Sequence, residues 1–136
     1  MRILIVEDNP SDVFLIEEAL REHNVAAQLE ILPDGEMAYS YWGRFLDANR
    51  PPCPDLILLD INLPKRNGLE VLERIRSTPA CAHTPVVIVS SSIKSDDLSK
   101  ARELGISHYF RKPSHLEAFL ELGAIIKGLT IGGTGG

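Results

Sequence analysis

The stretch Leu56-Ile57-Leu58-Leu59-Asp60 ("LILLD", residues 56–60) joins a short apolar run to an acid. Four consecutive apolar residues are typical of a strand that is buried on both faces, as in a parallel sheet. A carboxylate buried at the end of such a strand costs free energy unless it is paired, so its presence indicates a partner or a function. The residues that gather around Asp60 should therefore indicate what the chain does.

Other apolar runs of strand length precede and follow this one, and amphipathic stretches separate them. The runs are residues 3–6, 28–32, 86–89 and 109–110. Helices are expected over residues 10–22, 36–45, 68–77 and 98–104, and from the capping-box pattern at Ser114 to about Gly128. Prolines between residues 47 and 54 mark a loop. This alternation predicts an α/β fold, a doubly wound parallel sheet of five strands with helices on both faces.

Composition limits the classes of protein to which the chain can belong. Its 136 residues, 44% of them hydrophobic, are enough for one domain with a core. A net charge of -5 argues against a nucleic-acid-binding surface. No run approaches the roughly 20 apolar residues of a membrane span, and the first strand runs directly into acids, unlike a signal peptide. We expect a soluble, cytoplasmic protein in which Cys53 and Cys81 are unrelated reduced thiols.

Polar side chains follow four of the five predicted strands. They are Glu7 and Asp8, then Asp60 and Asn62, then Ser90, Ser91 and Ser92, and finally Lys112 before Pro113. Taken singly, each has an ordinary explanation as a helix cap, a loop residue or an exposed lysine. Because the carboxyl ends of parallel strands meet at one edge of a sheet, where ligands bind, we expect these side chains to lie together.

Their chemistry fits a phosphoryl group held with a metal ion. The carboxylates of Glu7, Asp8 and Asp60 repel one another unless a cation is present, and oxygen ligands of this kind suit Mg²⁺. The Ser90 hydroxyl and the Lys112 ammonium can hold phosphoryl oxygens. Asp60, at the end of a rigid strand, is the candidate nucleophile.

With these residues in place, the chain resembles bacterial response-regulator receiver domains over residues 2–128. The motifs that carry the resemblance are Val6-Glu7-Asp8-Asn9, Leu58-Leu59-Asp60 with Leu63-Pro64 and Gly68, Val89-Ser90-Ser91-Ser92, and Tyr109-Phe110-Arg111-Lys112-Pro113. The resemblance implies a flavodoxin-like (βα)5 receiver fold for residues 1–128. The glycine content of the last residues predicts a flexible tail at 129–136. Glu7-Asp8-Asn9-Pro10, the long proline-bearing loop and the absence of an output domain further resemble the single-domain regulators paired with bacterial phytochrome kinases.

The resemblance implies a role for each residue of the site. Asp60 would accept the phosphoryl group from the phosphohistidine of a histidine kinase. Glu7, Asp8, Asp60 and the backbone carbonyl of Asn62 would bind Mg²⁺, and Lys112 would pair with the phosphorylated carboxylate. The chain would thus be a signalling protein that catalyses only its own phosphorylation and dephosphorylation.

A conformational switch is implied in the same way. Ser90, which stands where threonine is more frequent in the family, would contact the phosphoryl oxygen, and Tyr109 would turn inward as Ser90 shifts. The peptide bond before Pro113 is expected to be cis. Asn62 and Ser92 lie where such proteins tune the attack of water on the acyl phosphate.

The output of the switch is expected to pass through protein contacts. The face formed by the fourth helix, the fifth strand and the last helix, near Tyr109 and Phe110, would mediate homodimerisation or partner docking. The expected partner is a histidine kinase, with no nucleic acid and no membrane involved.

Three other interpretations are weaker. A phosphatase with an aspartyl nucleophile usually has a second acid two residues further on, where this chain has Asn62. A flavin or nucleotide binder needs a Gly-rich or Ser/Thr-rich loop after the first strand, where Glu7 and Asp8 would repel a phosphate. A receiver-like interaction module that acts independently of phosphorylation would not need the complete set of acids, hydroxyl and lysine.

Overall fold

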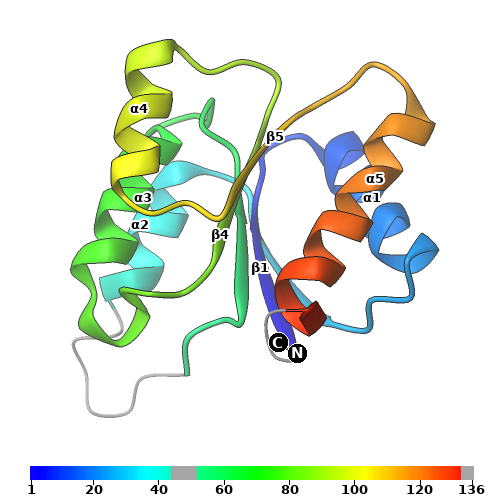
Figure 1. Cartoon of the computed structure of the whole chain (residues 1–136). Coiled ribbons are helices and arrows are strands. Elements are labelled where there is room, and N and C mark those ends of the chain that lie inside the picture. The colour runs from blue at the N-terminus through cyan, green and yellow to red at the C-terminus, as the bar shows by residue number, and fades with distance from the viewer. Residues whose placement is uncertain (44–51, 133–136) are drawn as a thin grey trace.

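The computed structural model describes residues 1–43 and 52–132, and Figure 1 shows its arrangement. The strands are β1 (Arg2–Val6), β2 (Gln28–Leu32), β3 (Leu56–Leu59), β4 (Val86–Ser90) and β5 (His108–Arg111). They form one sheet in the order β2-β1-β3-β4-β5, and every neighbouring pair is parallel. The predicted five-stranded parallel sheet is confirmed.

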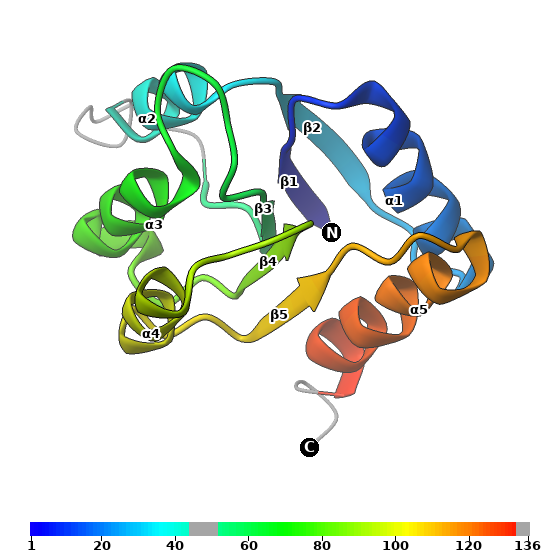
Figure 2. The ribbon, with the colours of Figure 1, turned by 90° about the horizontal axis from the view of Figure 1, so that it is seen from above.

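Helices cover both faces of this sheet, as Figure 2 shows from above. Their bounds are α1 (Pro10–Glu22), α2 (Gly35–Gly43), α3 (Gly68–Ser77), α4 (Ser95–Glu103) and α5 (Leu116–Lys127), with a 3₁₀ turn, η2 (Pro79–Cys81), and a π turn, η3 (Gly128–Gly132). Helices α1 and α5 lie on one face, and α2, α3 and α4 lie on the other. None of the helices within the described ranges is long and apolar enough to cross a bilayer.

The continuous apolar strands are explained by two cores, one on each face. Along β3, Ile57 and Leu59 pack on the side of α2, α3 and α4, whereas Leu56 and Leu58 pack on the side of α1 and α5. Each of these four side chains is at most 1% exposed. Because successive side chains of a strand point to opposite faces, a strand covered on both sides must be apolar throughout.

One predicted helix start is wrong, and some other predictions fall on residues outside the described ranges. The capping box expected at Ser114 is wrong: α5 begins at Leu116, after an extended His115 that makes no side-chain cap bond. Residues 114 and 115 are therefore still loop when the helix starts. Phe45, predicted to be helical, most of the proline-bearing loop, and residues 133–136 of the expected tail lie outside the described ranges.

The prediction of two separate thiols is also wrong, because Cys53 and Cys81 form a disulfide. Cys53 lies in the segment just before β3, and Cys81 lies fully buried in the turn after α3. The chain passes through β3 and α3 and returns, so the two Cα atoms are 5.8 Å apart, a normal separation for a disulfide. Their spacing of 28 residues in the sequence carries no sign of this return.

Reduction of this disulfide is expected to lower the free energy of unfolding by about 3 kcal/mol, because the bond closes a loop of 28 residues in the unfolded chain. Urea unfolding with and without a phosphine reductant measures the difference. Cys53→Ser cannot form the bond, so its stability should match that of the reduced chain both with and without reductant. Equal stability with and without reductant in the unsubstituted chain would contradict this expectation.

Candidate functional site

The candidate site lies where β1 and β3 end side by side at the centre of the sheet. Helix α1 follows β1 on one face and α3 follows β3 on the other, so the chain diverges at this edge of the sheet. The backbone holds both strand ends firmly. The Asp60 amide donates to Val6 O at 3.0 Å, and the Glu7 amide donates to Leu32 O at 3.1 Å.

Three acids meet at this edge as the sequence predicts. Carboxylate oxygens of Glu7, Asp8 and Asp60 all lie within 4.8 Å of one another. Asp8 is exposed, whereas Glu7 and Asp60 are buried, and Glu7 Oε1 accepts no well-aligned hydrogen bond from the described residues. Three carboxylates that lie this close together, two of them buried, offer the oxygen ligands that suit a hard divalent cation.

Lys112 brings the positive charge to this cluster from the loop after β5. Its Nζ donates to Asp12 Oδ2 at 2.8 Å and to Asp60 Oδ2 at 3.2 Å, and it lies 2.6 Å from Glu7 Oε1 as an ion pair. Burial alone would lower the pKa of Lys112, but the contacts with Asp12 and Glu7 and the charge of Asp60 outweigh it and raise the pKa. The lysine is therefore a permanent cation.

Glu7 is the acid whose protonation is most perturbed. Burial raises its pKa from 4.5 to about 7, the neighbouring charge of Asp60 acts in the same direction, and the contact with Lys112 opposes them. Glu7 is thus partly protonated near neutral pH when no cation is bound. A bound cation would have to displace that proton.

Asn62 connects Asp60 to the end of β4. Its backbone amide donates to Asp60 Oδ1 at 3.1 Å. Its side-chain amide donates to Ser90 Oγ at 3.2 Å and to Ser92 O at 3.0 Å. The fully buried Ser90 hydroxyl in turn donates to Ser92 O at 3.1 Å. The hydroxyl and the acid are therefore joined through one asparagine.

Gly68 allows α3 to start directly behind Asp60. A Cβ atom at this position would lie 2.1 Å from Asp60 O and 2.8 Å from the Cα of Ile61. The Gly68 amide donates to Ile61 O at 2.9 Å, and Asn67 caps the helix by accepting from the Glu70 amide at 3.0 Å. The loop that follows Asp60 is thereby fixed at both of its ends.

Two further predicted residues are Tyr109, which lies within β5, and Pro113, which lies in the loop that follows it. Tyr109 is half-buried and packs against the core on the side of α2, α3 and α4. The predicted cis bond before Pro113 is wrong: the described part of the chain contains no cis peptide bond. The trans form is the intrinsically favoured one before proline, and with it Lys112 still reaches Asp60.

Sequence reasoning missed two contacts of the site. Asp12 was not selected, because an acid in the first turn of a helix is usually explained by the helix dipole. The side chain of Asn62 was not assigned to Ser90, since its direction depends on the loop that follows Asp60. The signal available for Asp12 was its place in the helix that begins at the same sheet edge as Glu7 and Asp8.

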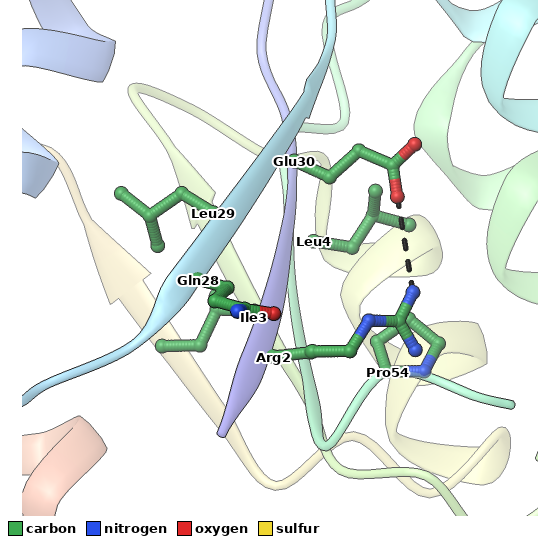
Figure 3. Close-up of a pocket in the computed structure, with 7 residues that line it drawn as sticks. All are labelled: Arg2, Ile3, Leu4, Gln28, Leu29, Glu30 and Pro54. Carbon is green, nitrogen blue, oxygen red and sulfur yellow. Dashed lines mark ion pairs between the residues drawn. The ribbon is translucent and has the colours of Figure 1, made fainter.

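A separate hollow of about 320 Å³ lies at the opposite, amino-terminal edge of the sheet. Figure 3 shows its lining, which includes Ile3, Leu29 and Pro54, with Arg2 paired to Glu30 at 3.9 Å. Arg2 also donates to Pro52 O at 2.7 Å. The charged groups of this hollow are paired with each other, and the hollow lies away from Asp60. We therefore assign phosphoryl and metal chemistry to the edge that holds Glu7, Asp8 and Asp60.

Comparison with known proteins agrees with this geometry. Residues 3–123 match the family described as the response regulator receiver domain. The response regulator Rcp1 of Synechocystis sp. is 36% identical over 120 residues, which cover 88% of this chain and 82% of Rcp1.

Two solved structures have the same fold. The phosphorylated cyanobacterial phytochrome response regulator RcpA has a TM-score of 0.81 at 37% identity, with 96% of this chain and 93% of RcpA covered. The Mn²⁺-bound form of Rcp1 has a TM-score of 0.80 at 34% identity, with 93% and 91% covered. This chain is therefore similar to a phytochrome response regulator and to a response regulator whose structure holds Mn²⁺.

Proposed function

The chain belongs to the response regulator receiver family, and from this premise we propose that Asp60 accepts a phosphoryl group from the phosphohistidine of a histidine kinase. The observation that carries the proposal is the position of Asp60, which contacts the Lys112 ammonium on one side and lies beside Glu7 and Asp8 on the other. This is the arrangement that a carboxylate nucleophile needs to approach an anionic phosphoryl group.

The transfer forms one bond and breaks one. A carboxylate oxygen of Asp60 attacks phosphorus, the bond between phosphorus and the histidine nitrogen breaks, and the electron pair stays on the imidazole. Glu7, Asp8, Asp60 and the backbone carbonyl of Asn62 are the residues that would hold Mg²⁺, which screens the charge of the transferred group. Lys112 would neutralise the negative charge of the phosphoryl oxygens.

The switch is proposed to start at Ser90. On phosphorylation its hydroxyl turns from Ser92 O to a phosphoryl oxygen, and the Asn62 side chain loses its acceptor on that hydroxyl. Tyr109, on the neighbouring strand, then turns inward from its half-buried position. A small displacement of the Ser90 hydroxyl would thus shift the equilibrium between the two positions of Tyr109.

The partners follow from the relatives and from the expected output face. Since RcpA is named a phytochrome response regulator, we propose a bacterial phytochrome kinase as the phosphodonor, and a cytoplasmic site of action. Homodimerisation would use the face of α4, β5 and α5. Residues 1–128 would form the receiver, and 129–136 a Gly-rich tail.

Metal affinity is expected to depend on pH through Glu7. Because the pKa of Glu7 is about 7 without a cation, Mg²⁺ must displace its proton below that pH, and affinity should rise about tenfold from pH 6 to pH 8. Calorimetric titration of the metal at several pH values measures this. Glu7→Gln should bind more weakly and with a flatter pH profile; a pH-independent affinity of the unsubstituted chain would contradict the role of Glu7.

The choice of kinase can be tested by phosphotransfer. A phytochrome kinase carrying radiolabelled phosphohistidine is mixed with the chain and Mg²⁺, and the label on each protein is followed in time. We expect label to move to the chain within seconds to minutes and to remain on the kinase when a chelator is present. Transfer from unrelated kinases but not from phytochromes would contradict the proposed partner.

A further inference from the structure

Lys112 is surrounded by more negative charge than its proposed role requires. Its ammonium has three N–H groups and contacts three carboxylates, those of Glu7, Asp12 and Asp60. Asp60 is the most distant of them, at 3.2 Å, whereas Asp12 lies at 2.8 Å. The ammonium therefore donates hydrogen bonds to Asp12 and Asp60 and is ion-paired with Glu7, so an incoming phosphoryl group must compete with carboxylates for it.

The Asp12 side chain is not the cap of its own helix. The N-terminus of α1 is capped by Asn9, whose side chain accepts from the Ser11 amide at 2.9 Å. Within the described ranges, Lys112 is the one hydrogen-bond partner found for the Asp12 carboxylate. The side chains of Lys112 and Asp12 are only 11% and 20% exposed, so water screens this pair less than an ordinary surface pair.

We propose that Asp12 is a positioning residue that competes with the phosphorylated Asp60 for the Lys112 ammonium. This inference rests on the proposed function. When Asp60 carries a phosphoryl group and Glu7 is bound to the divalent cation, Asp12 is the carboxylate that still attracts the lysine. Asp12 thereby weakens the contact between Lys112 and the phosphoryl oxygens and shortens the lifetime of the acyl phosphate.

The test uses beryllofluoride, a stable mimic of the phosphoryl group, in the presence of Mg²⁺. Fluorine NMR titration gives its affinity for the unsubstituted chain, Asp12→Asn, Asp12→Ala and the conservative Asp12→Glu. We expect Asp12→Asn and Asp12→Ala to bind about fivefold more tightly and to lose an acyl phosphate more slowly by a similar factor. Asp12→Glu should return towards the unsubstituted affinity, which a merely structural role would not predict.

A matched control is Glu17→Gln, which removes a charge from the same helix without touching Lys112. It should leave beryllofluoride affinity unchanged. Equal or weaker binding by Asp12→Asn, or an equal gain in Glu17→Gln, would overturn the competition. Failure of the unsubstituted chain to bind beryllofluoride would instead overturn the proposed function, and the inference with it.

Discussion

Lys112→Met is expected to lower the free energy of unfolding by about 3 kcal/mol in metal-free buffer, because removal of one member of a buried ion pair leaves the other uncompensated. The side chains of Glu7 and Asp60 are only 2% and 6% exposed, and both contact the ammonium. Protonation of Glu7, whose pKa is already raised, limits the loss. Mg²⁺ should reduce the deficit further, since it supplies the missing positive charge.

Urea unfolding of this variant in chelator and in Mg²⁺ measures both effects. The control is Lys100→Met, which removes an exposed lysine from α4 and should change stability by less than about 0.5 kcal/mol in either buffer. A loss in Lys112→Met that is the same with and without Mg²⁺ would show that the lysine does not balance the charges that bind the metal.

Gly68→Ala is expected to cost about 3 kcal/mol, at the upper end of the range for overpacking. Alanine is normally the better residue in a helix, but here its Cβ would lie 2.1 Å from Asp60 O. That carbonyl belongs to backbone, so relief requires α3 to move away from Asp60. We therefore expect a lower rate of Asp60 phosphorylation together with the loss of stability.

The matched control is Gly128→Ala, because a Cβ at Gly128 meets no atom within 4 Å and the backbone there is helical. This variant should be neutral or slightly more stable. Thermal unfolding compares the two substitutions directly. If both alanine variants were equally stable, the close approach of α3 to Asp60 would not hold in solution.

The positions of Glu7, Asp8, Asp60 and Lys112 were predictable from the sequence because one rule governs them all. In a parallel sheet every strand ends at the same edge, so a polar residue placed after an apolar run is located in space by the run itself. No knowledge of side-chain direction is needed. This is why the apolar runs alone predict that the acids at the ends of β1 and β3 meet, as they do.

The features that were missed depend on contacts between segments that no local pattern encodes. Cys53 and Cys81 meet because α3 packs back onto the sheet. Asp12 contacts Lys112, which lies 100 residues further along the sequence. An acid in the first turn of a helix is already explained by the helix itself, so nothing local indicates this contact. Ser114 matched a capping-box pattern, yet the loop after β5 remains extended beyond it, so the global path of the chain decided where α5 starts.

The most direct test of the account is covalent labelling of Asp60. The chain is incubated with acetyl phosphate and Mg²⁺ and its intact mass is compared with that of Asp60→Asn and of a sample with excess chelator. The account predicts a gain of one phosphoryl group in the unsubstituted chain with Mg²⁺ and no gain in the other two. A gain that persists in Asp60→Asn, or no gain under conditions that label another receiver domain, would contradict it.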